Sequence, residues 1–227
     1  MPPPRARRSR CATARTGPRS PRSARAAVIE PQQGYPWRVR IETAFVLDDA
    51  GLTQTVTAEN LSPTAAPVGL SAHPYLVGGA GLVDEWMLEL PASAILDVTS
   101  DRLIPTALVP VAERAALDFR DARPIADTAI DHAYTDLPRD ARGRAEARVT
   151  DASGRGVAIA WGPECAWVQV HTADRPAGDR DNRVGLAVEP MTCAPDAFNA
   201  DRYAWDTGLL TVAPGAAVEA SWTISAF

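Results

Sequence analysis

The chain has 227 residues, 46% of them hydrophobic, so it is long enough to build one large core or two small ones. It carries 23 basic and 28 acidic side chains, and every basic one is arginine. Eight arginines and no acid lie in residues 1–27, so residues 28–227 keep 15 basic and 28 acidic side chains, a formal charge of −13. Because phosphate binding needs clustered positive charge, this acidic body argues against nucleic acid as a partner.

Apolar stretches are short throughout the chain. None reaches 18 residues, which argues against a membrane span, and none near the start is suited to a secretory signal. The three cysteines, Cys11, Cys165 and Cys193, are odd in number and lack a paired spacing, which is typical of free thiols in a reducing compartment. These features favour a cytoplasmic protein and leave its oligomeric state open.

Residues 1–27 are rich in Pro, Arg, Ser and Ala and lack apolar periodicity. Such a composition cannot bury enough surface to offset its ordering entropy, so we expect a disordered segment. An Arg-rich arm for nucleic acid or targeting is the alternative interpretation. Beyond it, residues 39–47 and 52–58 alternate apolar and polar side chains around a turn at 48–51, which predicts an antiparallel hairpin.

Later segments repeat this period-two pattern. Alternating runs cover 86–90 and 167–172, and residues 144–150 and 157–161 flank a Gly-containing turn that predicts a second hairpin. In the C-terminal run, apolar positions 218, 220, 222 and 224 alternate with polar positions 219, 221, 223 and 225. Helical signals are confined to residues 112–119 and 196–203. With twenty prolines and fifteen glycines between short strands, the pattern predicts a single all-β domain over residues 28–227, a sandwich or a barrel.

Glu189 ends an apolar strand-like stretch at a proline. Pro190 has no N–H for a sheet ladder and holds the preceding residue in extended geometry. A carboxylate fixed at the rim of a sheet, before a Pro-punctuated loop, is well placed to act as a general base. The alternative is an ordinary solvated carboxylate at a strand end.

Three other runs offer polar side chains for chemistry. His73 precedes Pro74, so its backbone is extended and its ring can project into a cleft, although a lone histidine is usually a packing or surface residue. Asp131 stands beside His132, with a surface loop as the alternative. Gln169 and His171 share one face of their strand, where an ordinary cross-strand polar pair is the alternative. The histidines are too isolated in sequence to form a metal-binding spacing.

Taken together, five runs resemble the aldose 1-epimerase (galactose mutarotase) family over about residues 34–227: His73-Pro74-Tyr75, Ile130-Asp131-His132, Val168 to Thr172, Val188 to Thr192, and Pro214-Gly215. The resemblance implies a large antiparallel β-sandwich with a sugar cleft on one concave face. It implies Glu189 as general base, His73 as general acid, Asp131 as a carboxylate that holds sugar hydroxyls, and Gln169 and Tyr75 as cleft residues. It implies a small-molecule sugar as the partner and neither a metal nor an organic cofactor.

The resemblance also implies the reaction, which is interconversion of the α and β anomers of a free aldohexose such as glucose or galactose. Family members carry further strands, an Asn-Arg pair and a second histidine before the matched part. This chain has no histidine before His73 and no asparagine before Asn60. We therefore expect an epimerase body that lacks the family's first strands.

Three other functions remain open from the sequence. One is a catalytically impaired protein that binds sugar without turnover. Another is an epimerase for a hexose 6-phosphate, with an anion site supplied by Arg175, Arg180 and Arg183. The third is glycoside hydrolysis by Glu189 with Asp131, since two carboxylates suit that reaction.

Overall fold

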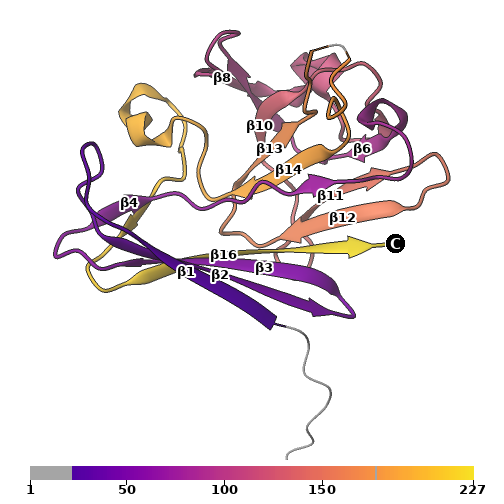
Figure 1. Cartoon of the computed structure of the whole chain (residues 1–227). Coiled ribbons are helices and arrows are strands. Elements are labelled where there is room, and N and C mark those ends of the chain that lie inside the picture. The colour runs from indigo at the N-terminus through magenta and orange to yellow at the C-terminus, as the bar shows by residue number, and fades with distance from the viewer. Residues whose placement is uncertain (1–21, 177) are drawn as a thin grey trace, which may run out of the picture.

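The computed structural model describes residues 22–176 and 178–227, which form two antiparallel sheets packed face to face (Figure 1). The larger sheet has the strand order β1-β2-β3-β16-β12-β11-β6-β9. Its strands are β1 (Arg22–Ile29), β2 (Val39–Asp48), β3 (Gly51–Asn60), β16 (Ala217–Ala226), β12 (Gly156–Trp161), β11 (Ala145–Thr150), β6 (Met87–Glu89) and β9 (Arg123–Pro124).

The second sheet has six strands in the order β5-β14-β13-β10-β7-β8. They are β5 (Tyr75–Leu76), β14 (Leu186–Met191), β13 (Trp167–His171), β10 (Asp131–Thr135), β7 (Ala94–Val98) and β8 (Pro105–Pro110). A separate pair joins β4 (Ala66–Val68) to β15 (Leu210–Val212). Four 3₁₀ segments complete the described part of the chain: η1 (Val83–Glu85), η2 (Val111–Glu113), η3 (Ala115–Leu117) and η4 (Ala197–Arg202).

The predicted all-β fold and both hairpins are confirmed. β2 and β3 pair along their whole length around the turn at Asp48–Gly51, and β11 pairs with β12 around the second turn. The weak helical signals correspond to η2, η3 and η4, all of which are short. None of these described helices is long and apolar enough to cross a membrane.

The expectation of disorder over residues 1–27 is wrong for residues 22–27, which form most of β1. This strand pairs with β2 over all eight residues, from Arg22 opposite Val46 to Ile29 opposite Val39. Every β1 side chain is exposed, so main-chain hydrogen bonds rather than burial hold the strand in place. A search for buried periodicity cannot detect such a strand. Residues 1–21, the rest of the expected segment, lie outside the described residues.

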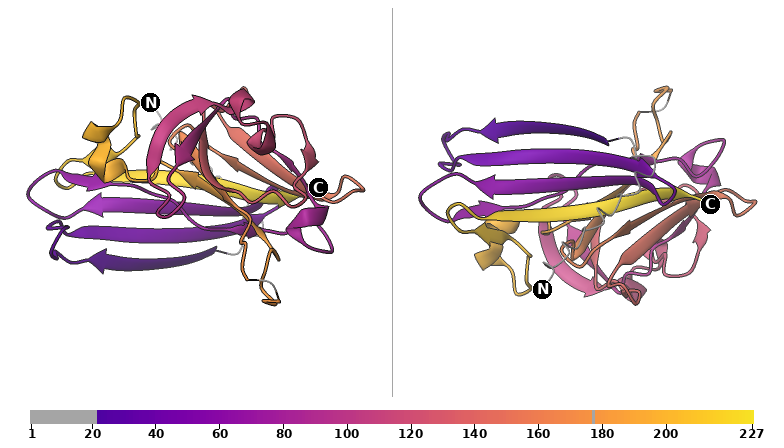
Figure 2. Two further views of the ribbon diagram at one scale, coloured as in Figure 1. Left: turned by 90° about the horizontal axis from the view of Figure 1, so that it is seen from above. Right: turned by 90° about the horizontal axis from the view of Figure 1, so that it is seen from below.

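The core lies between the two sheets. Its largest fully buried side chains include Trp86 from just before β6, Trp161 from β12 and Trp222 from β16. The six-stranded sheet contributes alternate residues of its central strands, such as Val168, Val170 and Val188. The residues between them therefore point to the other face of that sheet, away from the eight-stranded sheet. Figure 2 shows the placement of the two sheets from above and from below.

Candidate active site

The predicted site residues lie in two rows on the outer face of the six-stranded sheet. In the first row, Glu189 of β14 is the register partner of Gln169 of β13. In the second, Tyr75 of β5 is paired with Ala187, which pairs with His171, which pairs with Asp131 of β10. Because side chains two residues apart on a strand share a face, the two rows form one surface.

His73 belongs to the first row, opposite Glu189. The segment from Leu70 to Leu76 runs antiparallel to β14 in a single register: Ser71 bridges Met191 at one end, and Leu76 pairs with Leu186 at the other. That register places His73 across from Glu189. His73 Nε2 lies 3.1 Å from Glu189 Oε1, which is ion-pair distance. The two residues, 116 positions apart in sequence, are brought together by the ladder.

The segment that carries His73 is fastened to β14 on both sides of the histidine. The Thr192 N–H donates to the Leu70 carbonyl (2.9 Å), and the Leu70 N–H donates to the Thr192 hydroxyl (2.9 Å). The Ser71 hydroxyl donates to the Pro190 carbonyl (3.0 Å). On the far side, the Val188 N–H donates to the Pro74 carbonyl (3.3 Å). These bonds fix the backbone around His73 although half of its side chain is exposed.

Asp131, Gln169 and His171 form a second polar group beside the pair. The Gln169 amide donates to Asp131 Oδ1 (2.7 Å), and His171 Nδ1 lies 3.5 Å from Asp131 Oδ2. The His73 ring lies 4.9 Å from the Tyr75 ring and 6.5 Å from the His171 ring, measured between centroids. The surface therefore combines one acid–base pair with further carboxylate, amide and aromatic side chains.

Burial raises the pKa of Glu189 to about 7. The neighbouring His73 acts in the opposite direction and lowers this pKa, while the negative charge of Asp131 raises it further. The Glu189 side chain is 12% exposed, in contrast to 52% for His73, so the carboxyl has lost more of its hydration than the imidazole. A carboxyl with a pKa near neutrality can take up and release a proton at the pH of a cell.

Two polar atoms of this surface are buried and have no hydrogen-bond partner among the described residues: Gln169 Oε1 and His171 Nδ1. Buried polar atoms are normally paired, so these two are exceptions. His171 Nδ1 faces Asp131 Oδ2 at 3.5 Å, and neither atom has exposed surface that a ligand can touch unless its side chain turns. Ala187, small and fully buried, lies between His171 and Tyr75 in the second row.

All five predicted site residues share this surface, and His171 joins them. His171 was expected on the same strand face as Gln169 but was not among the predicted site residues. The signal was present, because residues two apart on one strand share a face. His132 does not join: it is paired with Val170, and both point to the core side of the sheet. Burial lowers the pKa of His132, which fits a packing role.

Arg183 does not serve as an anion site. Its side chain is 8% exposed and is held by ion pairs to Asp84 (3.0 Å) and Asp174 (2.6 Å). It also donates to the Ala126 carbonyl. These bonds tie the loop after β13 to the loop around η1, so the arginine has a structural role.

Within the described ranges, no cluster of three or more His, Cys, Asp or Glu residues is arranged to hold a metal ion.

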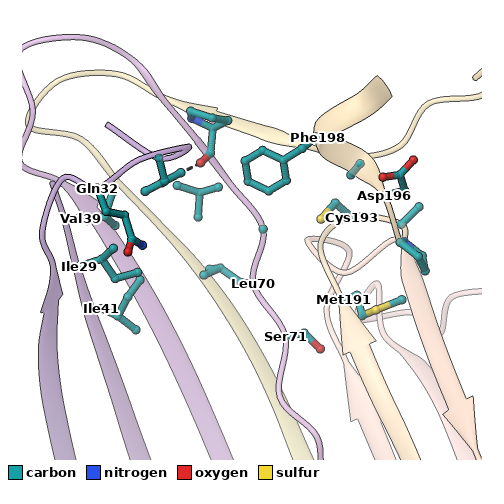
Figure 3. Close-up of a pocket in the computed structure, with 17 residues that line it drawn as sticks. Ile29, Gln32, Val39, Ile41, Leu70, Ser71, Met191, Cys193, Asp196 and Phe198 are labelled. Atoms are coloured by element: carbon teal, nitrogen blue, oxygen red, sulfur yellow. Dashed lines mark hydrogen bonds between the residues drawn. The ribbon is translucent and has the colours of Figure 1, made fainter. Parts of the chain in front are cut away.

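A cavity of about 570 Å³ lies beside the acid–base pair rather than on it, since neither His73 nor Glu189 lines it. Figure 3 shows the residues that do. It opens between the two sheets, where Ser71 and Met191 form the wall nearest the pair. A smaller cavity of about 260 Å³ lies on the other side and is lined by Tyr75 and Arg175. The surface that carries the site residues thus has a cavity at either side.

A family model described as aldose 1-epimerase matches residues 22–225. The chain belongs to the aldose 1-epimerase family. The matched range begins at Arg22, the first residue of β1, so it includes residues 22–27.

Among curated relatives of this epimerase-family chain is the uncharacterized protein YihR of Escherichia coli K12, which is 34% identical over 174 residues. Those residues cover 76% of this chain and 53% of YihR, so the chain spans about half the length of that relative.

Solved structures show the same fold. A galactose mutarotase-like protein of Clostridium acetobutylicum superposes with a TM-score of 0.74 at 15% identity, over 91% of this chain and 62% of that one. Galactose 1-epimerase of Lactobacillus acidophilus gives 0.69 at 16% identity, over 92% and 64%. These likenesses confirm the predicted β-sandwich of the galactose mutarotase type.

Proposed function

We propose that this family member is an aldose 1-epimerase that interconverts the α and β anomers of a free aldohexose such as glucose or galactose. The observation that carries the proposal is the pairing of His73 Nε2 with Glu189 Oε1 at 3.1 Å on an open, polar surface. Anomer interconversion needs one group to take a proton and another to deliver one. The acid–base pair supplies both, and the pKa of Glu189, about 7, suits proton uptake at neutral pH.

In the proposed reaction, Glu189 takes the proton of the anomeric hydroxyl while His73 delivers a proton to the ring oxygen. The bond between C1 and the ring oxygen breaks, and an aldehyde forms at C1. Rotation about the C1–C2 bond turns the other face of the carbonyl to the ring oxygen. Closure then reverses both proton transfers: His73 takes the proton back from the closing hydroxyl, and Glu189 returns one to the new anomeric oxygen.

The short separation of the two groups has a further use. If the open-chain sugar leaves before it closes, Glu189 holds a proton and His73 lacks one. Because the two atoms lie 3.1 Å apart, the proton can pass directly from the carboxyl to the imidazole and restore the starting state. Asp131 accepts hydrogen bonds from sugar hydroxyls, and Gln169, whose amide donates to Asp131 Oδ1, holds that carboxylate in place.

Polarimetry of freshly dissolved α-glucose and α-galactose tests the proposal. We expect the chain to accelerate mutarotation, and Glu189→Gln and His73→Asn each to reduce the acceleration by about 10²- to 10⁴-fold. Glu219→Gln, an exposed carboxyl of β16, is the matched control and should leave the rate unchanged. A folded chain that binds sugar without accelerating mutarotation would instead be the impaired binding protein.

A hexose 6-phosphate is the second candidate substrate, and Arg175 is the observation that favours it. Arg175 and Tyr75 line the same cavity of about 260 Å³, and the Tyr75 ring adjoins the His73 ring. Asp181 lines that cavity too, and its charge opposes an anion. Comparison of kcat/KM for glucose 6-phosphate and glucose, in the wild type and in Arg175→Gln, decides between the two substrates.

A further inference from the structure

We propose that β1 pairs with β1 of a second copy of this chain, so that two eight-stranded sheets join into one across a twofold axis. β1 forms the outer rim of the larger sheet, and no described strand pairs with its free edge (Figure 2). An open strand edge presents a row of unpaired N–H and C=O groups, which can serve as a template for another strand. This assembly does not depend on the proposed activity.

Among the outer strands of the two large described sheets, only β1 lacks the usual protection against such pairing. β5 and β9 are two residues long, and β9 contains Pro124. β8 begins and ends at a proline, and a register shift interrupts its ladder with β7. β1, in contrast, has eight residues without a proline and pairs with β2 without interruption. Short strands, prolines and bulges are common means of blocking an edge, so the long open edge of β1 favours a partner.

The side chains of β1 gain little from packing within one copy. All eight are exposed, and three of them are alanines, a residue with low strand propensity. Val28 and Ile29 remain 41% and 38% exposed. A ladder on the second edge would supply β1 with another set of main-chain hydrogen bonds and would cover part of this surface.

The direction of the main-chain groups in β1 follows from the neighbouring ladder. One residue beyond the paired ends of β2 and β3, the Leu61 N–H donates to the Arg38 carbonyl (2.9 Å). Bonded pairs alternate along an antiparallel ladder, so even-numbered residues of β2 bond to β3 and odd-numbered ones bond to β1. Their partners in β1 are odd-numbered as well. Ala24, Ala26 and Val28 therefore direct their N–H and C=O groups to the open edge.

A twofold axis at Ala26 pairs these outward-facing groups with one another. With Ala26 opposite Ala26 of the partner subunit, Ala24 lies opposite the partner subunit's Val28. The same register places Arg22 opposite the partner subunit's Glu30. Opposed residues of an antiparallel pair share a face, so each of the two Arg22–Glu30 pairs brings opposite charges together.

The charges of the strand select this register over its neighbours. A register centred on Arg25 would oppose two arginines, and one centred on Ala27 would leave Arg22 without an opposed acid. Glu30 is 63% exposed and pairs with Arg38 at 3.0 Å, and a carboxylate can accept hydrogen bonds from a second arginine as well. β1 and the residue after it are thus complementary in charge to their own antiparallel copy.

Other occupants of the edge fit it less well. Residues 1–21 contain five prolines and no Val, Ile, Leu or aromatic residue, so their composition is poorly suited to a strand that adds to β1. A different protein would need a matching charge pattern of its own, whereas a second copy has it by symmetry.

Sedimentation equilibrium of the full chain over a range of concentrations tests the interface. We expect a dimer, and we expect Arg22→Glu to weaken it about three- to thirtyfold, since two cross-strand ion pairs are lost. Combining Arg22→Glu with Glu30→Arg opposes unlike charges again and should recover most of the lost affinity. Arg142→Glu, which changes an exposed arginine in the turn before β11, is the matched control and should leave the dimer unchanged.

Cysteine substitution tests the register, in a Cys11→Ser background. Ala26→Cys would place two thiols directly opposite each other at a Cα separation of about 5.5 Å, which a disulfide can span, so mild oxidation should give covalent dimers. Ala24→Cys is the control. Its two copies would lie four residues apart along the ladder, about 14 Å, and should not crosslink.

A chain that stays monomeric at every concentration overturns the inference, and so does a dimer that Arg22→Glu leaves unchanged. Crosslinking of Ala24→Cys in place of Ala26→Cys overturns it too, because the twofold axis would then lie elsewhere. Since the substituted β1 side chains are all exposed, each variant should keep the circular dichroism of the wild type. The presence or absence of mutarotation in polarimetry bears on the proposed function alone.

Discussion

Glu189→Gln is predicted to make the protein more stable above neutral pH while it abolishes the proposed activity. Burial raises the pKa of Glu189 to about 7 from an ordinary value of 4.5. The folded state therefore holds the proton more tightly than the unfolded state, and the free energy of unfolding falls as the pH rises from 4.5 to 7. Below 4.5 both states are protonated, and this loss is absent.

The magnitude follows from the size of the pKa shift. A difference of 2.5 units corresponds to at most about 3.4 kcal/mol at about 1.36 kcal/mol per unit, and the carboxyl alone accounts for less because Glu189 and His73, 3.1 Å apart, titrate together. Glutamine has the shape of a protonated glutamate and cannot ionise. We therefore expect Glu189→Gln to exceed the wild type by about 1–3 kcal/mol in the free energy of unfolding at pH 8, and to differ little at pH 4.5.

Urea unfolding of both proteins at pH 4.5, 6, 7 and 8 measures this difference. The advantage of the variant should grow between pH 4.5 and 7 and then level off. Glu219→Gln serves as the control, since its carboxyl is exposed and its replacement removes no buried charge. The reasoning is refuted if Glu189→Gln is less stable than the wild type at pH 8, or if the difference between them is independent of pH.

Three further results are expected. The pH dependence of kcat/KM should be bell-shaped, with a limb that rises as Glu189 ionises and a fall as His73 loses its proton; in Asp131→Asn the rising limb should lie at lower pH, because a charge that raises the Glu189 pKa is gone. A limb unchanged by that substitution would count against the assignment. Asn60→Ala should cost about 2–4 kcal/mol of stability in urea unfolding, because the buried Asn60 amide donates to two carbonyls and its oxygen accepts the Ser62 N–H; a loss below 1 kcal/mol would contradict this. Gly51→Ala should lower the melting temperature measured by circular dichroism, since Gly51 has a φ of +119° and an added Cβ would lie 2.2 Å from the Ile224 carbonyl oxygen; an unchanged melting temperature would show that the turn relaxes.

The sequence predicted the parts of the fold that bury one face. The hairpins of β2 with β3 and β11 with β12 have alternating side chains because one side of each strand meets the core. β1 escaped prediction because it buries neither face, and its Arg and Ala side chains give no alternation. The division of the strands between two sheets could not be predicted from the sequence either, since pairings such as β16 with β3 join residues more than 150 positions apart.

Residues of the site were identified by resemblance, and their contacts required the fold. No sequence pattern states that His73 lies across from Glu189, because that depends on the register of two distant segments. Strand alternation, in contrast, would have assigned both other histidines. His171 lies two residues after Gln169 on one strand and so shares its face, whereas His132 directly follows Asp131 and so points to the core. The cavity of about 570 Å³ combines loops and strand ends and has no local signature in the sequence.

The ladder between residues 70–76 and β14 has a consequence for how such a protein can diversify. The spacing of His73 and Glu189 is set by the register of two segments, which main-chain hydrogen bonds and the hydroxyls of Thr192 and Ser71 hold together. The hollows at either side are lined largely by loops and strand ends, where substitutions are tolerated. Under the proposed function, reaction and selectivity are thereby separable: a lineage can exchange its preferred sugar by altering rim residues while the proton-transfer geometry is inherited intact.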